Sequence, residues 1–216
     1  MKKLYKDIGK GKSYFYYFGW SIIVFLVAFF LLFFFIFQAR FYVKRTERIE
    51  FFIAAYGMKN NDYNIEIQKE FKKDGLIEAN FFSYIESDPN VFSYFEANGE
   101  GADFIIFSET NIKDMNDYVK YHYVDISTLK SDIPNIEKYE TFNFEDVPYG
   151  LKIFDGGNEE YNANFSFTDL IEFTQEGKEK ESYYLLVNNQ SPNFDKEKGH
   201  TLGYSVLQYF LTNHEK

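Results

Sequence analysis

The sequence predicts a membrane-spanning helix followed by one α/β domain, a three-layer lobe with a mainly parallel sheet. Two observations carry this prediction. Residues 13–39 form a run of 27 residues without a charged side chain. Three strand–helix pairs then follow one another within about 75 residues, a pattern typical of parallel strands joined by right-handed crossovers.

The uncharged run 13–39 is long enough to cross a bilayer and its interfaces, because a helix of this length spans about 40 Å. Three tyrosines and Trp20 cluster at its start and Tyr42 follows its end, where amphipathic rings favour the headgroup boundary. A cleaved signal peptide is the alternative interpretation. Its apolar region spans about 7 to 15 residues and ends at small residues, so the longer run here favours an uncleaved anchor in contact with membrane lipid.

Charge divides the chain into two parts. Residues 1–12 hold five basic residues and residues 40–48 hold four. The positive-inside rule therefore favours 1–12 as a short cytoplasmic tail, 40–48 as a basic juxtamembrane linker and 49–216 as an extracellular domain at the cell membrane. The domain carries 14 basic and 31 acidic residues. Such an acidic surface argues against nucleic acid as a partner and favours cationic partners.

The first strand–helix pair of the domain follows the linker directly. Residues 49–55 are an uninterrupted apolar run, as expected for a buried strand. Apolar residues then recur with helical spacing from Tyr63 to Phe71, and Gly75 is placed to end this helix.

Two further pairs are predicted in the same way. Residues 77–86 form a second strand, and 88–99 a short helix that opens with Asp-Pro and closes with Asn-Gly. Residues 102–108 form the third strand. A helix with an apolar stripe from Ile112 to Val119 follows it.

The second half of the domain is less regular. Residues 124–146 show little periodicity and are expected to cross between parts of the fold. Residues 147–154 alternate like a strand, 155–181 are largely polar, and 182–188 form another buried strand. A final helix is predicted around Leu202 to Phe210.

This order of segments resembles the extracellular solute-binding proteins of ABC importers, which have the type 2 periplasmic-binding fold. The segments that carry the resemblance are IEFFIAAYG, ADFIIFSE, VDIS, VPYGLKIFD and YYLLVNNQSPN. The resemblance implies binding of a small solute such as a saccharide or peptide, and association with a membrane permease. Members of the family close two lobes on their ligand, whereas residues 155–181 are all that remains here of a second lobe.

Ligands of open α/β sheets bind at the carboxyl ends of the strands. The candidate ligand-binding residues at these ends are Tyr56, Gly57, Glu86, Ser108, Glu109 and Tyr149. Aromatic rings beside carboxylates and hydroxyls suit a sugar or a cationic ligand. The alternative is that these residues form ordinary loops in a tyrosine-rich chain.

Catalysis, metals and cofactors have no motif in the sequence. Because the chain has no cysteine, disulfides and thiolate metal sites are excluded. His122, His200 and His214 lack metal-ligand spacing and are expected at the surface or at helix ends. No Gly-x-Ser-x-Gly motif occurs, so a non-enzymatic protein without a cofactor is predicted.

The leading functional hypothesis is a single-pass membrane protein that displays a binding or interaction module outside the cell. Its partner would be a permease or another envelope protein. The first alternative is a true solute receptor whose cleft is completed by a second chain. The second is an envelope hydrolase that uses scattered carboxylates, and no motif supports it.

Overall fold

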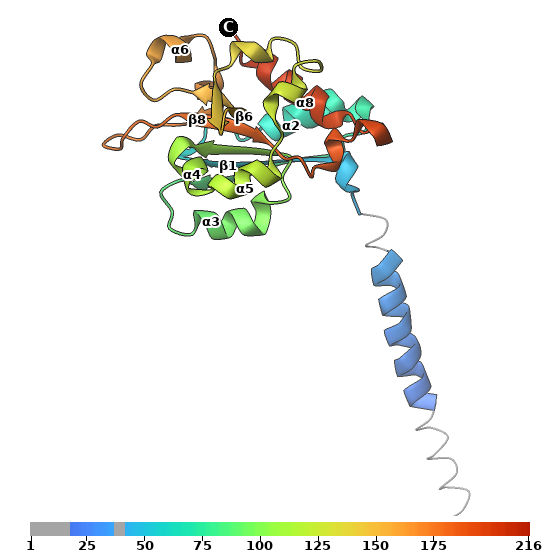
Figure 1. The fold of residues 1–216 in the computed structure, drawn as a ribbon. Helices are drawn as coiled ribbons and strands as arrows, with labels where there is room; N and C mark the ends of the chain where they lie inside the picture. The colour runs from blue at the N-terminus through green and yellow to red at the C-terminus, as the bar shows by residue number, and fades with distance from the viewer. Residues whose placement is uncertain (1–17, 37–41) are drawn as a thin grey trace, which may run out of the picture. The chain divides into compact units, whose positions relative to one another are not determined.

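The computed structural model describes residues 18–36 and 42–216, which belong to two separate units divided after Val43 (Figure 1). The predicted cytoplasmic tail 1–12 lies outside the described residues, as do both ends of the predicted membrane segment 13–39 and the start of the linker 40–48. The first described element is a helix over Phe18–Ile36. Its length and composition fit a membrane span, and a signal sequence near the N-terminus would fit equally well.

The second unit, Lys44–Lys216, contains a six-stranded sheet with the order β3-β1-β4-β8-β6-β5. The strands are β1 (Arg48–Ala55), β3 (Glu78–Ile85), β4 (Phe104–Ser108), β5 (Thr141–Phe144), β6 (Val147–Phe154) and β8 (Tyr183–Val187). Strand β1 pairs in parallel with both β3 and β4. Strand β8 runs antiparallel to β4 and β6, and β5 runs antiparallel to β6.

The prediction of an α/β fold with three parallel strand–helix pairs is confirmed, but the sheet as a whole is mixed and mostly antiparallel. One cause is a tight hairpin between β5 and β6. Its two turn residues, Glu145 and Asp146, both have positive φ angles, of 49° and 66°, as a hairpin with a two-residue loop requires. The other cause is β8, which enters the sheet from the end at which β6 leaves it.

Helices cover both faces of the sheet and form three layers (Figure 1). One face carries α2 (Tyr63–Glu70), α6 (Glu159–Ala163), α7 (Phe167–Leu170) and α8 (Leu202–Asn213), and the other carries α3 (Val91–Tyr94), α4 (Glu109–Asp114) and α5 (Asn116–His122). Short helical turns cover Arg45–Glu47, Phe71–Asp74, Phe95–Gly99, Ile126–Leu129, Ile136–Lys138, Pro192–Phe194 and Lys196–Lys198.

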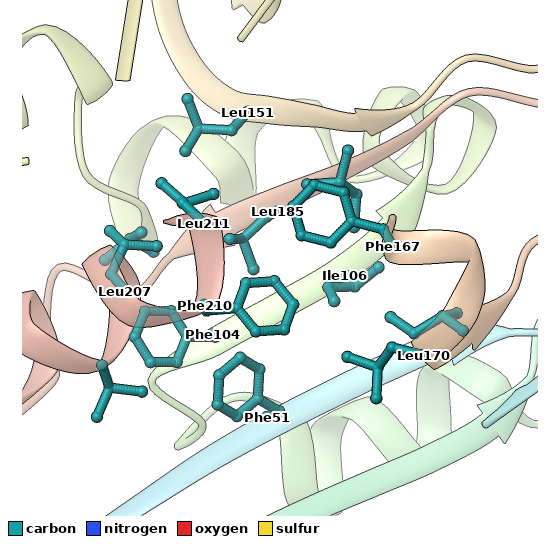
Figure 2. Close-up of a cluster of buried hydrophobic side chains, with 14 of the residues drawn as sticks. Phe51, Phe104, Ile106, Leu151, Phe167, Leu170, Leu185, Leu207, Phe210 and Leu211 are labelled. Carbon is teal, nitrogen blue, oxygen red and sulfur yellow. The ribbon is translucent and has the colours of Figure 1, made fainter. Parts of the chain in front are cut away.

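The alternation of side chains along the strands supplies a core to each face. In β1, Phe51 and Ile53 point to the α2–α8 face, whereas Phe52 and Ala54 point to the opposite face. The first core is aromatic at its centre (Figure 2). The Phe51 ring lies 4.6 Å from that of Phe104 and 5.3 Å from that of Phe210, which α8 contributes. This contact fixes α8 against the sheet.

Residues 155–181 pack onto the α2–α8 face and join its core. Phe165, Phe167 and Phe173 are buried there. A two-stranded sheet of β2 (Gly57–Met58) and β7 (Ile171–Glu172) ties this segment to the end of β1. The segment that the resemblance assigned to a reduced second lobe is thus part of the same folded unit.

A buried ionic network closes the opposite, amino-terminal end of β1 and β4. The carboxylate of Asp103, fully buried, accepts hydrogen bonds from Arg45 Nη1 at 2.9 Å and from the Glu50 backbone N–H at 2.7 Å. Asn193 Nδ2 donates to it at 2.9 Å, and the Ser191 hydroxyl donates to it as well. Arg45, placed by the sequence analysis in the linker, therefore belongs to the folded domain.

Candidate functional site

The carboxyl ends of β1, β3 and β4 lie at one edge of the sheet because these strands are parallel. After β1 the chain moves outward to β3 and then returns across β1 to β4. The strand order therefore reverses between β1 and β4, the position at which open α/β sheets bind ligands. The antiparallel strand β8 begins at this same edge, where Tyr183 pairs with Ser108.

Glu86 lies at this edge directly after β3, and its backbone N–H donates to the Ala55 carbonyl at the end of β1. Its carboxylate accepts hydrogen bonds from the Tyr183 hydroxyl and, at 3.3 Å, from Asn111 Nδ2. Burial raises the pKa of Glu86; hydrogen bonds from Ser108 and Tyr183 act to lower it, and the charge of Glu181 adds to the increase. One carboxylate thus connects the end of β3 with the starts of β8 and α4.

Tyr56 follows β1 and lies beside the same carboxylates. Burial raises its pKa, and the negative charges of Glu86 and Glu181 raise it further. The Tyr56 hydroxyl therefore keeps its proton at neutral pH and can donate a hydrogen bond. Glu181 is held at this edge by the Thr110 backbone N–H, which donates to its Oε2 at 3.3 Å.

Two of the carboxylates at this edge, those of Glu86 and Glu181, lack a basic partner in the part of the chain that the structure describes. None of the ion pairs found among residues 18–36 and 42–216 includes Glu86 or Glu181. Glu109, in contrast, is neutralised by Lys113 at 2.5 Å on the exposed face of α4. We call Tyr56, Glu86 and Glu181 the acidic edge. Its acceptor oxygens outnumber its donors, so it is suited to a cationic group that donates several hydrogen bonds.

The structure brings together four of the six candidate residues predicted from the sequence. Tyr56, Glu86, Ser108 and Glu109 lie at the carboxyl edge, where Ser108 Oγ also accepts from the Asn111 backbone N–H and caps α4.

The other two candidates have different surroundings. Gly57 lies next to Tyr56 but belongs to β2 and pairs with Glu172 of β7. Tyr149 lies near the start of β6, buried in the core on the α3–α5 face. Its neighbour Gly150 pairs with Leu186 of β8, which pairs with Ile105 of β4. Tyr149 is therefore about four residues, or about 13 Å, away from Ser108 along the strands. The structure therefore does not bring Tyr149 to the acidic edge.

Sequence reasoning missed three residues of this site, namely Asn111, Glu181 and Tyr183. The sequence analysis had placed the strand that contains Tyr183, but it expected a mainly parallel sheet. In a parallel strand, Tyr183 would lie at the opposite edge. The antiparallel direction of β8 is what brings Tyr183 to Glu86, 97 residues earlier in the chain.

In the described part of the chain, no group of three or more His, Asp or Glu side chains is arranged to hold a metal ion. Comparison with models of protein families, with curated proteins and with solved structures finds no match to this chain. The functional argument therefore depends on the residues of the site.

Proposed function

We propose that this protein is a single-pass membrane protein whose α/β domain lies outside the cell and binds a basic group of a partner. The partner in this proposal is a permease or another envelope protein. The observation that carries the proposal is the acidic edge, where Glu86 and Glu181 have no basic partner among the described residues. Burial raises the pKa of Tyr56 there, and the charges of these two carboxylates raise it further.

The electrostatics of the acidic edge favour such a ligand. Two neighbouring carboxylates that are partly withdrawn from water repel each other, and a bound cation removes this repulsion while forming charge-assisted hydrogen bonds. The net charge of the chain, −10, would also attract a basic surface from a distance and accelerate its association.

The membrane part of the proposal is supported by the apolar helix Phe18–Ile36 and by the excess of basic residues before it. The basic tail 1–12 favours an orientation with the domain outside. The resemblance of the strand segments to solute-binding proteins supports an importer permease as the partner. Protease digestion of intact cells tests the orientation, since an extracellular domain is cleaved without permeabilisation.

Site-specific photocrosslinking in native membranes tests the binding function. A photoreactive residue replaces Ser87, which is exposed beside Glu86, and the full chain is irradiated in its own membrane. We expect a discrete adduct that is lost in the double variant Glu86→Gln with Glu181→Gln. The matched control is Glu176→Gln with Glu179→Gln, which removes the same charge from exposed positions in the loop before β8.

Two outcomes would contradict the proposal. An adduct that persists in the Glu86/Glu181 variant would show that the acidic edge does not hold the partner. Stabilisation of the full chain by a saccharide or a peptide, lost in the same variant, would instead favour the solute receptor completed by a second chain.

A further inference from the structure

A second polar site lies away from the acidic edge, on the α2–α8 face. A pocket of about 290 Å³ opens between the start of α2, the end of α7 and the end of α8. Its lining includes Tyr63 and Glu66 from α2, Asp169 from α7 and His214 after α8. We call it the His214 pocket.

Two buried side chains that line the His214 pocket, Tyr63 and His214, each carry a polar atom without a partner among the described residues, and we call them its floor. Tyr63 and His214 are 4% and 8% exposed. In the described part of the chain, neither the Tyr63 hydroxyl nor His214 Nε2 has a hydrogen-bond partner. A buried polar atom left unpaired costs about 1–3 kcal/mol, so two of them in one pocket indicate a site built to receive hydrogen bonds from outside the chain.

The imidazole of His214 is held in one orientation. Its Nδ1 lies 3.3 Å from the Ser166 hydroxyl. The ring centre lies 4.9 Å from that of Phe167, 5.3 Å from that of Phe210 and 5.5 Å from that of Tyr63. When Nδ1–H donates to Ser166, Nε2 carries a lone pair and accepts a hydrogen bond.

The rim of the pocket is negatively charged. Glu66 and Asp169 are exposed, and none of the ion pairs in the described ranges includes either of them. Burial lowers the pKa of His214, although its contact with Ser166 and the charges of Asp169 and Glu66 act in the opposite direction. The floor is thus neutral at neutral pH, beneath two carboxylates.

We propose that the His214 pocket binds the primary ammonium group at the end of an alkyl chain. The three N–H donors of an ammonium match the acceptors present here, namely His214 Nε2, the Tyr63 oxygen and the carboxylates of Glu66 and Asp169. A quaternary ammonium has no N–H, so it leaves His214 Nε2 and the Tyr63 oxygen without a hydrogen bond. A neutral polyol can pair with these two atoms but leaves the carboxylates of Glu66 and Asp169 without a counter-charge.

Isothermal titration calorimetry on the full chain in lipid nanodiscs tests this proposal. The probes are n-butylamine and Nα-acetyl-lysine amide, with tetramethylammonium and myo-inositol as comparisons. Each is titrated to about 10 mM, ten times the dissociation constant of a weak millimolar complex. We expect saturable binding of the two primary amines alone. The tighter of the two identifies the source of the ammonium group, a free amine or a lysine side chain.

Variants separate binding from folding. Tyr63→Phe keeps the ring and removes the unpaired hydroxyl, so it should weaken amine binding about tenfold without lowering the unfolding temperature. Tyr209→Phe is the matched control on α8, because Tyr209 packs on Phe71 and does not line the pocket. The Glu86→Gln with Glu181→Gln variant should bind amines normally, which distinguishes this proposal from the proposed function.

Three results would overturn the inference. They are no binding of either amine, comparable binding of tetramethylammonium or myo-inositol, and amine binding that Tyr63→Phe leaves unchanged.

Discussion

Replacing Asp103 with asparagine should destabilise the folded domain strongly, although the two side chains have nearly the same shape. In the structure one carboxylate oxygen accepts from Arg45 and the Glu50 backbone, and the other accepts from Ser191 and Asn193. An asparagine amide would face two of these donors with its own NH₂ group. It would also leave Arg45 without its most buried counter-charge.

The size of the effect follows from these contacts. Breaking a buried ion pair by removing one partner costs about 3–5 kcal/mol, and two hydrogen bonds to a charged acceptor cost about 3 kcal/mol or more when lost. These contributions overlap at Asp103, so we expect a loss of about 4 kcal/mol. For a domain of this length that corresponds to a decrease of about 8–16 °C in the unfolding temperature.

Thermal unfolding of the full chain in detergent, followed by near-ultraviolet circular dichroism of the tyrosines, measures this effect. The control is Asp114→Asn at an exposed position of α4, which should change stability by less than about 0.5 kcal/mol. In a double-mutant cycle, Asp103→Asn and Arg45→Gln should be non-additive by about 1–3 kcal/mol. A loss below about 1 kcal/mol for Asp103→Asn would refute the assignment of this network as a clamp between β1, β4 and the segment before β1.

Two further predictions concern the backbone. A methyl group at Gly156 would overlap the Lys180 carbonyl, whereas one at Gly157 would meet nothing closer than 3.7 Å. Gly156→Ala should therefore lower the free energy of unfolding by about 1–3 kcal/mol, and Gly157→Ala should lower it much less. Urea unfolding of the two variants measures the difference. In the β5–β6 turn, the double variant Glu145→Asn with Asp146→Gly should stabilise the fold by about 1 kcal/mol. Asparagine and glycine tolerate the positive φ angles of this turn better than the native glutamate and aspartate do. An unchanged or lower unfolding temperature would contradict this account of the turn.

Local sequence patterns were sufficient to place most strands. The strand predicted at residues 147–154 is observed as Val147–Phe154, and the apolar runs at 49–55 and 182–188 become β1 and β8. These segments were predictable because an apolar run between turn residues has few other ways to bury its side chains. The turn at Glu145 and Asp146 was missed because it lacks the Asn-Gly or Asp-Gly pair that usually indicates such a hairpin.

The candidate site was predictable only where it depended on strand ends. Tyr56, Glu86 and Ser108 follow or end parallel strands, so the sequence indicated them directly. Tyr183 lies at the start of an antiparallel strand and was missed. His214 was expected at the surface or at a helix end, and it does follow α8. Its burial depends on α7 and α2, which pack over it from distant parts of the chain.

The apolar helix, the acidic charge of the domain, the α/β class and the positions of most strands were predictable from the sequence alone. Each of these is a property of composition or of local periodicity. The direction of β8, the packing of residues 155–181 and the burial of His214 depend on tertiary contacts that local patterns do not contain. An apolar run that is buried on both faces has the same pattern in either direction. Its direction is set by hydrogen bonds to strands far away in the sequence, and these bonds assemble both the acidic edge and the sheet on which the His214 pocket is built.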